Sequence, residues 1–222
     1  MGVLLMLITI GGLVVAGVLL VVSAFGKKTW LRNFTLRGTA VWFVFYAVML
    51  IGSSIFSKER TLSLNEAKEY CGFYLDCHMH TAVIGVRTAK TLGNRTGNGE
   101  FYIIKVKVFS DAKQALLGLL TVDAHVVDDR NNQYSRDMFA ESQLTPQPDF
   151  EQKILPAESF EKEIVFDLPS DMKNPRLDLR EGYGVDHVIE AILIDDEDSI
   201  CHKRNYFKLQ EQNETASQNR ER

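Results

Sequence analysis

The sequence predicts a mainly β protein in which an antiparallel β-sandwich follows two transmembrane α-helices. Two long uncharged apolar runs occupy the first quarter of the 222 residues. From about residue 78 onward, apolar and polar side chains alternate in several segments, and turn-forming residues separate those segments. The length allows one or two domains.

Charge is distributed unevenly along the chain. Residues 1–60 carry a net charge of +5 and residues 61–222 carry −9, which together give the −4 of the whole chain. This split argues against a soluble cytosolic enzyme. It also argues against a nucleic-acid binder, because the larger, acidic part lacks the basic surface that phosphate recognition requires.

The first apolar run covers residues 3–25 and holds no charge in 23 positions. A helix of that length is about 34 Å long, enough to cross a hydrocarbon core of roughly 30 Å. A cleaved signal peptide is disfavoured, because no Lys or Arg precedes the run and the run exceeds the usual apolar region of such peptides. The second run covers residues 39–56, and its length of about 27 Å also suffices.

The segment between the two runs, residues 26–38, holds four cations and no acid (Lys27, Lys28, Arg32 and Arg37). Positive charge beside membrane spans favours the cytoplasmic side. We therefore expect residues 1–57 to form a two-span hairpin in the cell membrane, with a cytoplasmic loop and an extracytoplasmic C-terminal domain. Gly11, Gly12 and Gly17 are compatible with a close contact between the helices, or with ordinary glycines of a membrane helix.

Residues 58–77 are expected to form a stalk. Within it, residues 61–70 are expected to form a short helix or a stiff linker, and Ser63 and Glu66 have the spacing of a capping box. Residues 210–222 hold no apolar side chain larger than Ala216 and are expected to be disordered.

The segment from 78 to 209 is expected to form the sandwich. Alternation or β-branched composition predicts strands near 80–87, 104–108, 122–126, 164–168, 187–194 and 205–209, and residues 135–144 fit one helical turn or an irregular crossing. Patterns of helical period long enough for parallel βαβ units are absent from the sequence. An antiparallel sandwich of immunoglobulin type is therefore predicted, with a small barrel as the alternative.

Four short stretches of this segment are similar to a known pattern. They begin at Phe101, Val122, Leu155 and Ile164, and they include the hairpin with Asp128, Asn132 and Tyr134. The segment resembles the immunoglobulin-like domain of unknown function found in bacterial lipoproteins and anchored membrane proteins. Ala157 stands where that family usually has Gly. The resemblance implies a fold and an extracytoplasmic location, and it brings no catalytic motif.

Three cysteines are present, at 71, 77 and 201. An extracytoplasmic domain is expected to pair two of them. The five residues between Cys71 and Cys77 can fold back, and the small ring would contribute roughly 2 kcal/mol. A pairing of either with Cys201 is the alternative.

Histidines offer a candidate metal site. His78 and His80 are two residues apart and would share one face of a strand. In a sandwich of this type the chain enters beside the loop before the last strand, so His202 and the acidic run from Asp195 to Asp198 should lie at the same, membrane-facing pole. A hydrogen-bonded rim without metal is the favoured interpretation, and zinc ligation by His78, His80 and His202 is the alternative.

Motifs for nucleophilic or phosphate chemistry are absent from the sequence. We therefore expect a protein that is not an enzyme, that needs no cofactor, and that contacts membrane lipid and an envelope protein. The expected role is protein interaction or envelope assembly. The alternatives are a metal-dependent sensor or hydrolase, and a structural subunit of a membrane complex.

Overall fold

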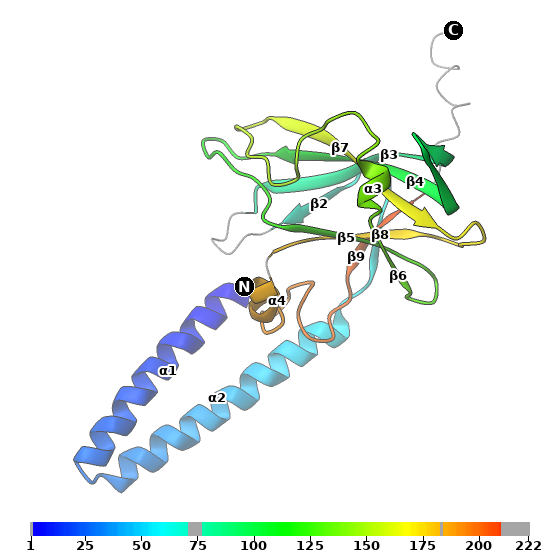
Figure 1. Cartoon of the computed structure of the whole chain (residues 1–222). Helices are drawn as coiled ribbons and strands as arrows, with labels where there is room; N and C mark the ends of the chain where they lie inside the picture. The colour runs from blue at the N-terminus through cyan, green and yellow to red at the C-terminus, as the bar shows by residue number, and fades with distance from the viewer. Residues whose placement is uncertain (1, 71–76, 183, 210–222) are drawn as a thin grey trace. The chain divides into compact units, whose positions relative to one another are not determined.

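The chain divides into two compact units (Figure 1). The computed structural model describes residues 2–70, 77–182 and 184–209. The helical unit combines residues up to 59 with residues 184–204, and the sandwich unit combines residues 60–183 with the chain from 205 onward.

Two long helices dominate the helical unit: α1 (Gly2–Phe25) and α2 (Thr29–Phe56). Both are long and apolar enough to cross a membrane. The predicted loop over 26–38 is wrong in extent, since only residues 26–28 separate the helices. Residues 29–37 contain neither Gly nor Pro, so nothing in them interrupts a helix, and its hydrogen bonds begin with the Arg32 N–H donating to the Lys28 carbonyl at 3.2 Å.

The two helices are antiparallel and contact each other through Trp42, whose indole Nε1 donates to Thr9 Oγ1 at 3.1 Å. A Cβ atom placed on Gly11, Gly12 or Gly17 would meet nothing within 4 Å. These glycines therefore do not mark a close contact between α1 and α2. Gly12 instead lines a pocket of about 230 Å³ with Thr9, Gly38 and Trp42.

Two packed β-sheets form the sandwich unit. One sheet has five strands in the order β1-β9-β8-β5-β6, and the other has four in the order β2-β3-β4-β7. All strand pairs in these sheets are antiparallel except β1 with β9, which is parallel. The strands are β1 (Arg60–Leu62), β2 (Ala67–Tyr70), β3 (Met79–Leu92), β4 (Arg95–Ser110), β5 (Val122–Val127), β6 (Gln133–Ser135), β7 (Ser159–Leu168), β8 (Arg176–Glu181) and β9 (Asn205–Lys208).

Alternation of side chains builds the core, as β7 illustrates. Ile164, Phe166 and Leu168 are fully buried between the two sheets. Val165 points to the other face, where it packs with Phe101 in a smaller cluster that includes Ala140 of the short helix α3 (Met138–Glu141). The middle of β7 is therefore buried on both faces, which is why Ile164, Val165 and Phe166 form an unbroken apolar run.

Most predicted strands are confirmed, since the segments 80–87, 104–108, 122–126 and 164–168 lie within β3, β4, β5 and β7, and 205–208 forms β9. The helical turn expected within 135–144 is α3, whose first turn is capped by Asp137 accepting from the Ala140 N–H at 2.9 Å. The predicted tail, 210–222, lies outside the described residues.

Two element predictions are wrong. Residues 61–70 form no helix but contribute to β1 and β2, because Leu62, Lys68 and Tyr70 alternate inward and are buried. The buried Lys68 ammonium donates to the Leu179 carbonyl of the opposite sheet at 2.8 Å, which gives this polar group a hydrogen-bond partner inside the protein. Residues 187–194 form no strand but continue from the helix α4 (Gly184–Glu190) into turns.

The outer edge of β7 is covered by the chain that follows β6. The side-chain amide of Gln147 donates to the Glu163 carbonyl at 2.6 Å and accepts from the Glu163 N–H at 2.8 Å, in the manner of a neighbouring strand. The Asp137 N–H donates to the Val165 carbonyl at 2.7 Å. Three backbone groups in the middle of this edge, at Glu163 and Val165, are thus occupied.

Candidate metal centre

The connection between β8 and β9, residues 184–204, is a compact folded segment of the helical unit. It begins with α4 and returns through a series of turns, closed by the Ile200 N–H donating to the Ala191 carbonyl at 3.0 Å. Asp195 and Cys201 adopt positive φ angles of 69° and 64°, which allow the sharp reversals. This folding brings the acidic run next to α4.

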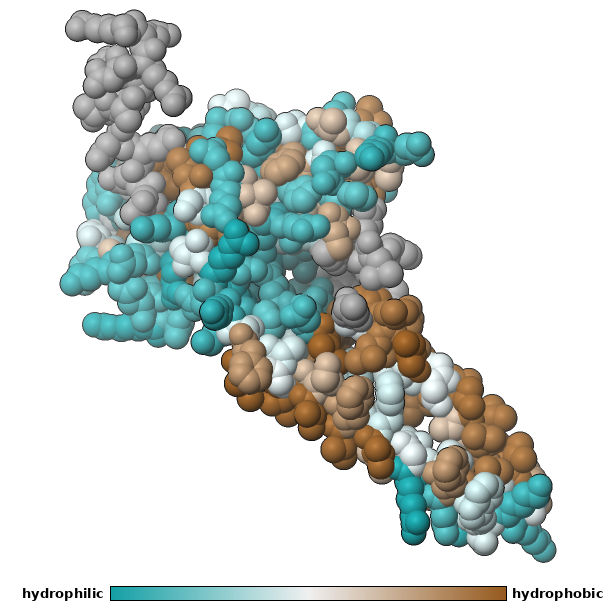
Figure 2. Space-filling model, turned by 180° about the vertical axis from the view of Figure 1, so that it is seen from behind, coloured by the Kyte–Doolittle hydropathy of each residue, from teal (hydrophilic) through white to brown (hydrophobic). Residues whose placement is uncertain are grey.

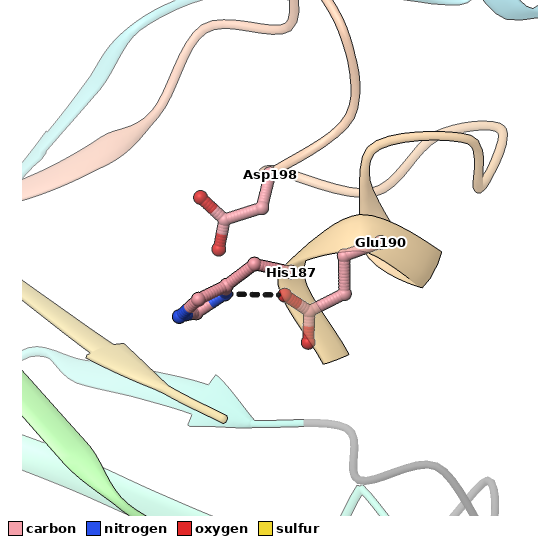
Figure 3. Close-up of side chains that lie close together, drawn as sticks. All are labelled: His187, Glu190 and Asp198. Atoms are coloured by element: carbon pink, nitrogen blue, oxygen red, sulfur yellow. Dashed lines mark hydrogen bonds and ion pairs between the residues drawn. The ribbon is translucent and has the colours of Figure 1, made fainter. Parts of the chain in front are cut away.

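His187 and Glu190 of α4 and Asp198 of the following turn converge (Figure 3). His187 Nδ1 lies 2.9 Å from a Glu190 carboxylate oxygen, and one potential ligand atom from each of the three residues lies within 4.8 Å of the others. Among the described residues, this is the one group of three or more His, Cys, Asp or Glu side chains that lie close enough to bind a single metal ion. All three side chains are half-buried.

Carboxylates crowd this centre. Burial raises the pKa of Glu190, and the neighbouring Asp196 and Asp198 raise it further, while His187 opposes the shift. Burial likewise raises the pKa of Asp196, although that carboxylate accepts a hydrogen bond from the Asp198 N–H at 2.9 Å. Arg204 offsets part of the negative charge, since its Nε lies 3.1 Å from Asp198 Oδ1.

One imidazole nitrogen and two carboxylates are ligands that Zn²⁺ and Mn²⁺ accept, and three protein ligands leave positions for water. The chemistry available is therefore the binding of a divalent cation. Without a cation, His187 pairs with Glu190 and Arg204 pairs with Asp198.

The three histidines that the sequence analysis grouped as a metal site lie in two different units of the chain. His78 Nδ1 and His80 Nε2 lie 2.7 Å and 3.4 Å from the two carboxylate oxygens of Asp111, in the sandwich unit. The hydrogen bond from His78 lowers the pKa of Asp111 against the effect of burial. His202 belongs to the helical unit, where its Nδ1 lies 2.9 Å from the Lys203 carbonyl oxygen. The three therefore do not form a ligand group in the part of the chain that the structure describes.

Cys201 is exposed and carries a free thiol, so the alternative pairing, in which it bonds to Cys71 or Cys77, is not formed. Cys71 lies outside the described residues, and its pairing with Cys77 remains a prediction.

Sequence reasoning missed His187 and Glu190 because it assigned their segment to a strand. Residues three apart lie on opposite faces of a strand but on the same face of a helix. The helical signal was present in Val188, Ile189, Ile192 and Leu193, whose spacing of one, four and five residues is typical of an apolar helix face.

No family model matches the chain, and no curated protein sequence matches it. Among solved structures, the chain is similar to the secreted protein MPT63 of Mycobacterium tuberculosis, with 11% identity, a TM-score of 0.40, and coverage of 57% of this chain and 92% of that one. The yjhA protein of Bacillus subtilis has 12% identity and a TM-score of 0.42, over 68% of this chain and 100% of that one. An uncharacterised β-sandwich protein of Clostridium difficile has 14% identity and a TM-score of 0.35, over 69% and 97%. The assignment as a β-sandwich rests on the strand pairing described above.

Proposed function

We propose that this protein is an integral membrane protein whose sandwich unit is displayed outside the cytoplasm to bind another envelope protein, without catalysis. The observation that carries the proposal is the surface of α1 and α2, on which 23 large apolar side chains are exposed. Figure 2 shows that apolar residues cover much of the helices on the face in view, with hydrophilic residues gathered at their far end. At roughly 1–2 kcal/mol each, exposing these side chains to water would cost on the order of 30 kcal/mol, more than the 5–15 kcal/mol by which a typical domain is stable.

The stagger of the helices limits where the bilayer crosses them. Because Thr9 lies beside Trp42, the start of α1 is level with the part of α2 near residues 49–52, and Arg37 is level with the part of α1 near residues 14–17. A hydrocarbon core placed on residues 39–56 of α2 would therefore leave the second half of α1 in water. That half exposes six large apolar side chains (Val14, Val15, Val18, Val21, Val22 and Phe25), at a cost of roughly 10 kcal/mol.

A core that extends from the loop at Lys28 to the level of Gly2 avoids that cost. It covers all of α1, and it places the exposed Trp30 and the ring of Tyr46 near its two boundaries, where aromatic side chains are favoured. Its cost is the inclusion of Arg32 and Arg37, at most about 3 kcal/mol each and less when a long side chain reaches back to the headgroups. It also leaves Ile55 and Phe56 beyond the core, at a further cost of roughly 3 kcal/mol together. This placement is therefore the better one.

Orientation follows from the cations at the loop, which favour the cytoplasmic side and so place the sandwich unit outside. Fusions of alkaline phosphatase and of a fluorescent protein test this. After Leu209, the phosphatase is expected to be active and the fluorescent protein dark, and after Lys28 the reverse. Phosphatase activity restricted to the Lys28 fusion would contradict the proposed topology.

We also propose that the sandwich is of immunoglobulin type. The chain passes from one sheet to the other between β4 and β5, between β6 and β7, and between β7 and β8, as Greek-key connections do. The first strand pairs in parallel with the last, β9, which joins the two ends of the domain. This fold commonly serves binding, which supports an interaction role.

The interaction is tested by cross-linking the full-length chain in its native membrane and capturing it by affinity. The matched control is residues 1–59 alone, which retain both helices. We expect an envelope protein that is enriched with the full chain and absent from the control. Equal recovery with both chains would assign the interaction to the helices, as in a structural subunit of a membrane complex.

The centre formed by His187, Glu190 and Asp198 supports a second candidate function, a divalent-cation sensor or a metal-dependent hydrolase. Elemental analysis of the purified full-length protein after incubation with Zn²⁺ or Mn²⁺ tests it. Retained metal should be lost in a His187→Ala, Glu190→Gln double variant and kept in His202→Ala. Metal that persists in the double variant, or that is never retained, would contradict it.

A further inference from the structure

The β8–β9 connection is fixed against the two long helices at three points. The Tyr46 hydroxyl donates to the Ile192 carbonyl at 2.7 Å, and the Lys203 N–H donates to Ser57 Oγ at 2.9 Å. Gly2 packs against the Ile194 backbone so closely that a Cβ atom there would overlap the Ile194 carbonyl oxygen. The connection therefore lies beside the start of α1 and along the last turns of α2.

The connection has an apolar side that the protein leaves uncovered. Leu193 and Ile194 are buried, but Val188, Ile192 and Ile200 are 68%, 46% and 51% exposed. The hydrogen bond from the Ile200 N–H to the Ala191 carbonyl holds the backbone at Ile200 beside the backbone next to Ile192. Three branched apolar side chains in a segment of 21 residues are thus exposed where the segment meets two apolar helices.

The position of this side along the helices identifies what covers it. Tyr46 lies about 27 Å along the helix axis from Lys28, close to the thickness of a hydrocarbon core. The Ile192 carbonyl that accepts from its hydroxyl is therefore at the depth of the outer headgroup layer when Lys28 marks the inner boundary. Continuity with the apolar surface of α1 and α2 favours lipid at this depth rather than water.

We propose that residues 184–204 form a membrane-interface element, in which Val188, Ile192 and Ile200 enter the outer headgroup layer of the bilayer beside the helix pair. The occupant of this surface is lipid. The proposal rests on the proposed membrane insertion of α1 and α2, and it adds a third contact with the bilayer that comes from the loop before the last strand. The chain just before the last strand, β9, is thereby held at the membrane surface.

Spin labels on the full-length protein in phosphatidylcholine–phosphatidylglycerol vesicles test the proposal. Cys201→Ser removes the exposed free thiol, and Val188→Cys, Ile192→Cys and Ile200→Cys are then introduced and labelled one at a time. The label's accessibility to oxygen is compared with its accessibility to a water-soluble nickel chelate. We expect the ratio to be several-fold higher at the three positions than at Lys113→Cys, an exposed site of the sandwich unit.

Val15→Cys, in the exposed middle of α1, separates the possible failures. If the label at Val15 is in lipid but those at 188, 192 and 200 match the label at 113, the interface element is refuted and membrane insertion stands. Labels at the three positions that are shielded from both reagents would indicate a covering protein and would also refute it. A water-exposed label at Val15 would refute membrane insertion itself. The spectrum of the β-sheet in circular dichroism confirms that each variant is folded.

Discussion

Truncating Leu62 tests whether residues 60–62 belong to the sandwich or to a stalk. The Leu62 side chain is 3% exposed and lies in the main core, on the strand that pairs in parallel with β9, where its register partner is Phe207. Leu62→Ala removes buried methyl groups and leaves a cavity, which in other cores costs about 3–4 kcal/mol. For a domain of this size we expect the midpoint of thermal unfolding to fall by ~10 °C.

The assay is thermal unfolding of the β-sheet signal in circular dichroism, with the full chain in detergent. Thr61→Ala is the matched control, because Thr61 is the exposed neighbour on the same strand and its truncation should change stability by less than about 0.5 kcal/mol. A stalk residue would be in water and its truncation would cost nothing. Equal midpoints for the Leu62 and Thr61 variants would therefore refute the placement of β1 in the sandwich.

Three further perturbations have defined outcomes. Ala157 adopts a φ of 63°, so Ala157→Gly should raise stability by about 1 kcal/mol in the same unfolding assay, because glycine has no Cβ to strain there. Burial raises the pKa of Asp128, but hydrogen bonds from Asn132 and the Arg130 N–H outweigh it and lower the pKa below its usual value. The carboxylate therefore stabilises the β5–β6 hairpin above about pH 4 and loses this effect as the pH falls through the lowered pKa, so Asp128→Asn should remove this part of the pH dependence of amide exchange in the hairpin. Gly2→Ala should displace Ile194 and increase amide exchange in residues 187–200, whereas Gly17→Ala should not, because its Cβ meets nothing.

Each of these outcomes has a contradicting result. An Ala157→Gly variant that is less stable than the parent would show that the gain in unfolded-chain entropy exceeds the relief of strain. Hairpin exchange that keeps its acid-dependent increase in Asp128→Asn would assign that increase to another group. Equal exchange in the Gly2 and Gly17 variants would show that the connection is not seated on Gly2.

Local periodicity was sufficient to predict the long central strands. In β4 and β7 the alternation of side chains is set by the two faces of the sheet, and it is legible without knowledge of the rest of the chain. The hairpin tip at Asp128 was also predictable, because its side chain accepts hydrogen bonds from backbone groups only two and four residues away.

Long-range contacts were not predictable in the same way. β1 and β2 are three and four residues long, too short for a period to be distinguished, and their burial depends on partners more than a hundred residues away, such as Phe207 and Leu179. The candidate metal centre could not be predicted from the sequence for a related reason. His187, Glu190 and Asp198 meet only when α4 forms and the chain reverses at Asp195, and a strand assigned to the same residues separates them.

The side-chain amide of Gln147 affects whether neighbouring copies of the protein can pair through the edge of β7. A ten-residue strand such as β7 would be a template for sheet extension between molecules if its backbone were open. Anchoring would confine all copies to a thin layer and raise their effective concentration, so that even weak pairing would spread along the surface. By occupying both backbone groups of Glu163, Gln147 leaves an incoming strand without hydrogen-bond partners at that residue, which interrupts strand pairing in the middle of β7.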